Sequence, residues 1–283
     1  MMHRVLVQCF VLFLVVALHA QELPQLSPSA TVGQRIGLVD VKVTYSRPSA
    51  KGRRVFGDLV PYGEIWRTGA NHCTVIELSG AVTIAGKELP AGKFSVFTVP
   101  NQGAWEVIFN RNTELSGTDG YDPAVDVLRT KAVSRPAAGA ESFVILFENL
   151  GQDRADLVLR WAKEEISLPL EADANKMAMQ NINEALQKPD ADYVAYARSA
   201  GFYLDRGIDP NKALEWAQKS VSMEKKYWNT FYLARALAAT GQFNAAVTKG
   251  NEAAELATAE KNPGAAKTYQ SQIAEWKAQS KGN

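Results

Sequence analysis

The stretch KFSVFTVPNQGAWEVIFN, residues 93–110, indicates the fold class of the first half of the chain. Its two runs, 93–99 and 105–110, are rich in β-branched and aromatic residues, and Asn101-Gln102-Gly103 separates them with turn-forming residues. Side chains alternate between the two faces of a strand, so Trp105, Val107 and Phe109 share one face. We interpret this face as part of a hydrophobic core and the stretch as two strands joined by a turn.

The same period of two extends on both sides of this stretch. Further strand-like runs occupy 38–45, 74–78, 81–89, 125–133, 141–147, 155–161 and 165–170. Short strands separated by Gly, Pro and Asn favour an antiparallel β-sandwich or jelly-roll-like domain. We therefore predict such a domain over residues 35–171, preceded by a linker over residues 21–34.

The pattern changes to that of helices in residues 172–283. Ala, Leu, Lys, Glu and Gln dominate there, and we predict helices near 174–188, 191–206, 210–223, 227–240, 242–259 and 264–279. The sequence FYLDRG at 202–207 recurs as ALAATG at 236–241, a spacing of about 34 residues that is typical of tetratricopeptide-like helical hairpins. The chain is thus predicted to be an α+β protein in two parts. The helical part is either a surface that binds a protein partner or a structural appendage.

Residues 1–20 have the pattern of a secretory signal peptide. A short basic start precedes the apolar run VLVQCFVLFLVVAL, and the small residue Ala20 ends the segment. We therefore expect an exported protein, periplasmic or extracellular, with no membrane span after cleavage. The mature chain would keep one histidine, His72, and one cysteine, Cys73, so that no intrachain disulfide could form.

Charge and motifs exclude several classes of function. The chain has 31 Lys and Arg against 30 Asp and Glu, a formal net charge of +1, which does not predict binding to nucleic acid. Fingerprints for a serine nucleophile, a phosphate-binding loop, a dinucleotide and a zinc protease are missing from the sequence. We predict neither a cofactor nor a metal site, and we assign no catalytic residue.

Residues 46–74, SRPSAKGRRVFGDLVPYGEIWRTGANHCT, combine bases, aromatics and turn formers within one long connection between strands. A connection of this length inside a compact domain is usually functional or packs separately. Arginine offers a planar fork for carboxylate, phosphate or sulfate, and an aromatic ring can stack on a ligand. The candidate ligand-binding residues are Arg47, Lys51, Arg53, Tyr62, Glu64, Trp66, Arg67, Asn71 and His72.

Several motifs together resemble the domain of unknown function family 2911. They are SRPSAKGR, FGDLVPYGEIWRTGAN, LPAGKFSVFTVP, the Trp-led strand WEVIFN, and YDPAVDVLR. The resemblance covers roughly residues 25–170 and, more loosely, the helical tail. It implies a β-rich exported bacterial domain and no particular activity. The chain carries His72-Cys73 where the family pattern leads us to expect an acidic residue followed by a small one, so the resemblance assigns no role to this pair.

Three hypotheses for function remain open at this point. The first is a non-catalytic binding module for a small polar or anionic ligand, such as a saccharide or a peptide terminus, with a helical tail that contacts a protein. The second is an envelope hydrolase or isomerase that uses Glu64 or His72 as acid or base. The third is a purely structural or assembly protein, in which residues 46–74 brace the sandwich.

Overall fold

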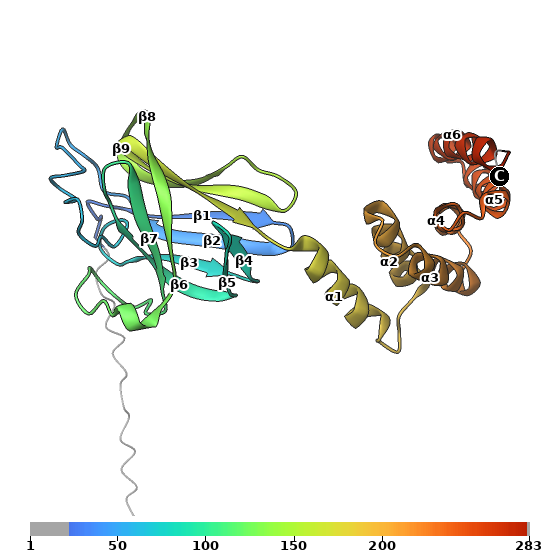
Figure 1. Ribbon diagram of the computed structural model, residues 1–283, viewed down its shortest axis with the longest axis horizontal. Helices are drawn as coiled ribbons and strands as arrows, with labels where there is room; N and C mark the ends of the chain where they lie inside the picture. Colours follow the sequence, from blue (N-terminus) through green and yellow to red (C-terminus); the bar gives the residue numbers. More distant parts are fainter. Residues whose placement is uncertain (1–22, 282–283) are drawn as a thin grey trace, which may run out of the picture. The chain divides into compact units, whose positions relative to one another are not determined.

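The computed structural model describes residues 23–281, and the chain divides after Ala172 into a sheet unit and a helical unit (Figure 1). Each unit has its own hydrophobic core, so each is described by itself. The α+β organisation predicted from the sequence is confirmed. The predicted signal peptide, residues 1–20, lies outside the described residues.

The sheet unit is built from nine antiparallel strands. They are β1 (Ser29–Ile36), β2 (Val39–Ser46), β3 (Thr74–Leu78), β4 (Val82–Ile84), β5 (Lys87–Leu89), β6 (Gly92–Val99), β7 (Ala104–Asn110), β8 (Asp126–Glu148) and β9 (Arg154–Glu171). A short 3₁₀ helix, Pro123–Val125, precedes β8. The strand order is β1-β2-β3-β6-β7-β8-β9-β4-β5. The quoted stretch 93–110 forms β6 and β7, which are neighbours in the middle of this order.

The long strand β8 joins the two layers of the sandwich. Its first part, residues 126–133, pairs with β7, and its second part, residues 134–148, pairs with β9. The hydroxyl of Tyr45 on β2 accepts a hydrogen bond from the main-chain N–H of Ile145 on β8 and donates one to its carbonyl, at 3.0 and 3.2 Å. The core therefore lies between β2 and the second part of β8, with side chains from both layers buried.

Three details of the sheet differ from the sequence prediction. Residues 29–34 belong to β1 rather than to the predicted linker, because all of β1 pairs with β2 although SATVGQRI is only weakly apolar. Residues 81–89 form the hairpin β4-β5 instead of one strand, since Ala85 and Gly86 both adopt left-handed conformations and reverse the chain. The last four predicted runs merge into two strands, β8 and β9, whose pairing shifts register at Ala140.

The helical unit contains α1 (Ala174–Leu186), α2 (Tyr193–Arg206), α3 (Pro210–Met223), α4 (Tyr227–Ala239), α5 (Phe243–Ala259) and α6 (Pro263–Ser280). The helices α2 and α4 begin 34 residues apart, which matches the repeat length found in the sequence. Asp173, Asp192, Asp209 and Asn262 cap α1, α2, α3 and α6 through side-chain bonds to main-chain N–H groups. Within residues 23–281, the helices are too short or too polar to cross a membrane.

Candidate functional site

The segment between β2 and β3, residues 47–73, has no long strand or helix but is fixed to the sandwich at several points. Trp66 exchanges main-chain hydrogen bonds with Thr98 of β6, at 2.7 and 2.9 Å. Ser49 forms a bridge to Ser142 of β8. These bonds satisfy backbone groups that a loose loop would leave to water, so the segment is an ordered part of the domain.

Trp66 is the main anchor of this segment. Its side chain is only 8% exposed and lies in an aromatic cluster whose ring centroids are 4.7–6.4 Å apart. The cluster consists of Phe56, Trp66, Trp105, Phe143 and Trp161. Aromatic pairs of this kind contribute about 0.5–1.5 kcal/mol each beyond the area they bury. Trp66 is therefore first a core residue, and only its remaining surface is available to a ligand.

The backbone around Arg67 is held in an uncommon conformation. Thr68 has a left-handed φ of 56° and is fully buried, and its carbonyl accepts a 2.6 Å hydrogen bond from the hydroxyl of Thr74. Gly69 has a φ of 156°, and a Cβ atom there would lie 3.1 Å from the carbonyl oxygen of Ser46. The Trp66 indole N–H donates to the Gly69 carbonyl at 3.0 Å. These contacts fix the position of Arg67 between Trp66 and Thr68.

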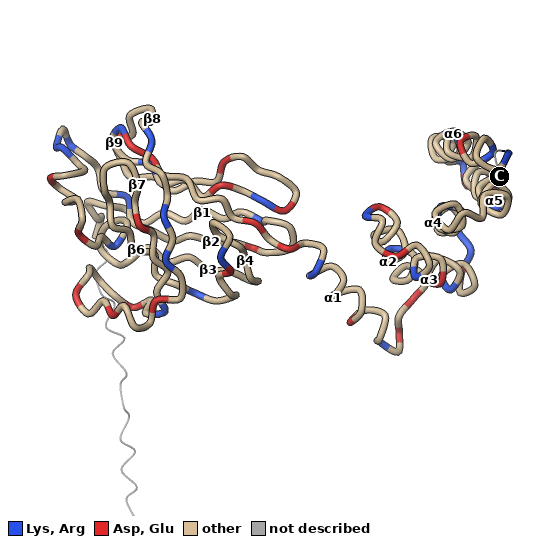
Figure 2. The backbone as a smooth tube through the Cα atoms, viewed as in Figure 1, with Lys and Arg blue, Asp and Glu red and all other residues tan. Residues whose placement is uncertain are grey.

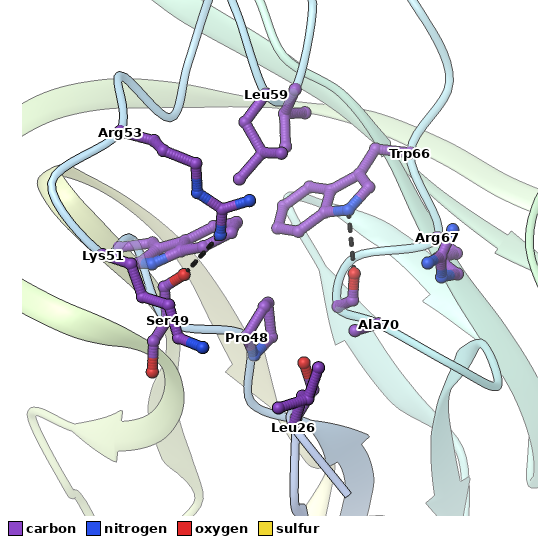
Figure 3. A pocket seen from close by; sticks show the side chains of 13 residues that line it. Leu26, Pro48, Ser49, Lys51, Arg53, Leu59, Trp66, Arg67 and Ala70 are labelled. Atoms are coloured by element: carbon purple, nitrogen blue, oxygen red, sulfur yellow. Dashed lines mark hydrogen bonds between the residues drawn. The ribbon is translucent and has the colours of Figure 1, made fainter.

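A cavity of about 390 Å³ opens beside Trp66. It is lined by Leu26, Ser27, Pro48, Ser49, Lys51, Arg53, Leu59, Val60, Trp66, Arg67, Gly69, Ala70 and Trp161. Figure 3 shows Lys51 and Arg53 on one side of the cavity and Trp66 and Arg67 on the other. The sequence prediction named four of these residues: Lys51, Arg53, Trp66 and Arg67.

The charge of the lining has one sign. Lys51, Arg53 and Arg67 contribute three cations, whereas the described residues that line the cavity include no Asp or Glu. Nor does any of the three form an ion pair with a carboxylate in residues 23–281. The main chain of Lys51 does contact a carboxylate, because its N–H donates to Glu141 Oε1 at 2.7 Å. Uncompensated positive charge around a cavity favours an anionic ligand.

The three cations differ in how firmly the protein holds them. Arg53 donates from Nη2 to the Ser49 carbonyl at 2.8 Å (Figure 3). It also donates from Nε to the Ala50 carbonyl at 2.9 Å, and the two bonds orient its guanidinium. The Nε of Arg67 is buried and has no hydrogen-bond partner within residues 23–281. Trp105 Nε1 is also buried without a partner, but Trp105 does not line the cavity. A buried donor without a partner costs free energy.

Three other predicted residues do not line the cavity and are engaged in internal bonds. Arg47 donates from Nε to the Phe143 carbonyl at 3.0 Å. Tyr62 donates to Glu164 at 3.1 Å, and burial together with the Glu164 charge raises the pKa of its phenol. The Asn71 amide donates to Gln25 and to the Ser27 carbonyl at 3.0 and 3.1 Å. These residues hold the segment in place.

The two candidate acid–base residues also lie outside the cavity lining. Glu64 is exposed on the surface. His72 is exposed as well, and its Nδ1 lies 2.7 Å from the hydroxyl of Ser116. His72 lies before β3, which begins at Thr74, and it forms an isolated bridge to Ser116.

Sequence reasoning missed the apolar part of the site. Leu26 and Leu59 are 85% and 40% exposed although both are large apolar residues, and both line the cavity. Leu26 falls in the stretch interpreted as a linker, and Trp161 comes from a distant strand, so neither was connected with residues 46–74. Exposed leucines beside a cavity are the signal that indicates a site for an apolar group. In the described part of the chain, His, Cys, Asp and Glu form no cluster that could hold a metal ion.

Comparison with protein families finds one match to the sheet unit. The family described as "Protein of unknown function (DUF2911)" matches residues 27–170. This range begins just before β1, ends in β9, and includes the whole of the cavity except Leu26. Comparisons with curated proteins and with solved structures find no match.

Proposed function

This chain belongs to the DUF2911 family of proteins of unknown function, and we propose that its sheet unit binds a small organic anion in the cavity beside Trp66. The observation that carries this proposal is that Lys51, Arg53 and Arg67 all line a cavity to which no Asp or Glu of the described residues contributes. Lys51 and Arg53 are exposed and Arg67 is partly buried, so an anion in the cavity would be attracted by all three charges. A carboxylate is the simplest group that a guanidinium fork and an ammonium can share.

The apolar wall narrows the class of ligand. Leu26, Leu59, Val60 and Trp66 lie around the same cavity as the cations. A volume of about 390 Å³ is at the lower end of ligand pockets, which span about 300–1,000 Å³. The ligand that fits is therefore a small molecule or group with one carboxylate and an adjoining apolar part, rather than a highly polar saccharide.

Binding of this kind needs no catalytic group. Glu64 and His72 lie outside the lining, so the proposed site brings no acid–base residue to the ligand. The exported location implied by residues 1–20 and the protein-binding role of the helical unit stay predictions. Within residues 47–73, Arg47 and Trp66 hold the segment against the sandwich. The ligand is bound by Arg67, Arg53 and Lys51.

The proposal is tested by calorimetric titration of the chain with apolar carboxylates and with the matching uncharged amides. We expect a carboxylate to bind and its amide to bind at least about tenfold more weakly, since a charge-assisted hydrogen bond contributes about 1.5–3 kcal/mol. Arg67→Met keeps the aliphatic stem and removes the fork, so it should weaken binding by about tenfold or more. Arg54→Ala is the matched control, because Arg54 is an exposed neighbour of Arg53 that does not line the cavity.

Measurements of protein stability distinguish a residue that binds ligand from a residue that only holds the segment 47–73 in place. Arg67 Nε is a buried donor without a hydrogen-bond partner within residues 23–281, so Arg67→Met should not lower the melting temperature of the free protein. Arg47→Met removes the bond to the Phe143 carbonyl and should lower stability by about 1–3 kcal/mol. The proposal is wrong if no carboxylate binds, or if Arg67→Met and Arg54→Ala bind ligand equally well.

A further inference from the structure

The strand β1 lies at one end of the strand order and offers a second binding feature beside the cavity. It forms a ladder with β2 alone among the described strands, so that alternate N–H and C=O groups along it point away from β2. Ser29, Thr31, Gly33 and Arg35 are exposed on it, and its sequence SATVGQRI contains neither Pro nor Lys. Arg35, near the C-terminal end, is its one charged residue, and edge strands with few blocking residues can accept another strand.

The cavity and this edge are continuous. Leu26 and Ser27 line the cavity, and β1 begins two residues later at Ser29. The segment between them is fixed, because the Pro28 carbonyl accepts a bond from the Arg47 N–H at 2.9 Å and the Ser27 carbonyl accepts one from Asn71. The cavity is therefore at the N-terminal end of β1.

The direction of the chain decides which end of an added peptide would reach the cavity. Every pairing in the sheet is antiparallel. A peptide that adds to β1 in the same manner runs toward Ser29, so its C-terminus arrives beside Ser27. There it meets Lys51, Arg53 and Arg67, which suit a carboxylate.

We propose that the anion bound in the cavity is the C-terminal carboxylate of an extended peptide that adds to β1 as an antiparallel strand. This inference rests on the proposed function and names its ligand. The side chain of the last residue is apolar and lies against Leu26, Leu59 and Trp66. The preceding residues bind through their main chain, which gives affinity with little dependence on sequence.

The test uses N-acetylated peptides of about six residues that end in leucine, titrated into the full chain. At about 3.4 Å per residue, such a peptide covers most of β1. We expect the free acid to bind at least about tenfold more tightly than its C-terminal amide, and at least about tenfold more tightly than N-acetyl-leucine. Hydrogen exchange should slow at the main-chain amides of β1 that point away from β2.

N-methylation of the peptide supplies a matched control. In an antiparallel ladder, successive residues point their N–H groups alternately toward and away from the neighbouring strand. Of two peptides methylated at adjacent positions, one should therefore lose about tenfold or more in affinity, and the other should bind almost as the unmodified peptide. Arg67→Met should weaken the unmodified peptide by the same factor as it weakens N-acetyl-leucine.

The outcomes separate this inference from the proposed function. If N-acetyl-leucine binds as tightly as the longer acid, and neither methylation matters, the cavity binds a small carboxylate and strand addition is wrong. If neither acid binds, or Arg67→Met changes nothing, both proposals fail. If the amide binds as tightly as the acid while β1 amides are protected, strand addition holds and the carboxylate assignment is overturned.

Discussion

Arg47 and Arg67 come from the same segment and carry the same charge, but their guanidinium groups serve different purposes. The Nε of Arg47 donates to a main-chain carbonyl across the sandwich, so this side chain is satisfied by the fold. The Nε of Arg67 is buried and has no hydrogen-bond partner within residues 23–281, so the fold leaves this donor unsatisfied.

Cys73 provides a prediction at the same scale. Its side chain is 4% exposed, packs with Phe97 and Ile108, and donates from Sγ to the Gly117 carbonyl at 3.1 Å. Burial raises the pKa of the thiol above its ordinary value, so the folded protein favours the neutral form. We expect Cys73 to resist alkylation at about pH 8 in the folded chain and to react readily in denaturant.

The raised pKa of Cys73 also has a consequence for stability. The contribution of the thiol is fully present below the pKa of the unfolded chain, and it is lost as pH rises through the higher pKa of the folded chain. Urea unfolding measured from neutral to alkaline pH should show a loss of stability that is smaller in Cys73→Ala, which has no thiol to titrate. Rapid alkylation of the folded protein, or identical pH profiles for the two chains, would contradict this prediction.

At the scale of elements, the bend of β8 determines where the site can form. The pairing of β8 with β9 shifts register between Pro136 and Ala140 and again between Ala140 and Val144. Such irregularities bend a strand and increase its twist, which allows one strand to belong to both layers. As a result Phe143 of β8 and Trp161 of β9 meet Trp66 from the segment 47–73, and the cavity opens beside them.

In the helical unit, Gly250 marks the closest approach of two elements. A Cβ atom at this position of α5 would lie 2.6 Å from Ile273 and 3.1 Å from Trp276, both on α6. We predict that Gly250→Ala lowers stability by about 1–3 kcal/mol through overpacking, although alanine favours helix by up to about 1 kcal/mol. Gly264→Ala is the matched control, since the nearest atom to a Cβ there is at 3.7 Å.

Thermal unfolding followed by circular dichroism measures both glycine variants. Gly264→Ala should melt at the temperature of the unmodified chain or slightly above it, and Gly250→Ala several degrees below it. Equal melting temperatures for the two variants would show that α6 shifts at no cost, and the packing argument for Gly250 would then be wrong.

For the whole molecule, each unit has the properties of a separate domain. The aromatic cluster around Trp66 belongs to the sheet unit, and the cluster around Trp216, Phe231 and Trp276 belongs to the helical unit. Acidic and basic residues are mixed along both units (Figure 2), so neither presents a field of one sign over its whole length. The cations around the cavity are thus a local feature that the net charge of +1 does not reveal.

Independent cores predict independent unfolding. We expect calorimetry to show two transitions, with Arg47→Met lowering only the transition of the sheet unit and Gly250→Ala lowering only that of the helical unit. Fragments 23–172 and 173–281 should each fold when expressed alone, as judged by circular dichroism. A single transition shifted by both variants, or fragments without structure, would show that the two units depend on each other.

The sequence by itself determined the period of each element and the place where the chain changes from strands to helices. These depend on local alternation, capping residues and turn formers, which act over a few residues. It also placed Lys51, Arg53, Trp66 and Arg67 in one candidate segment, because arginine and tryptophan in a long connection are visible without coordinates. The spacing of 34 residues between α2 and α4 was predicted on the same basis.

Only the tertiary structure decided which of the nine candidate residues face one cavity. A side chain in an irregular segment has no period that tells inside from outside, so Arg47 and Arg67 look alike in the sequence. Hairpin pairing with β2 made the weakly apolar residues 29–36 into β1, and contacts between residues far apart in the chain brought Leu26 and Trp161 to the same cavity. Long-range contacts select among local possibilities of similar free energy, and that selection cannot be made from a short stretch of sequence.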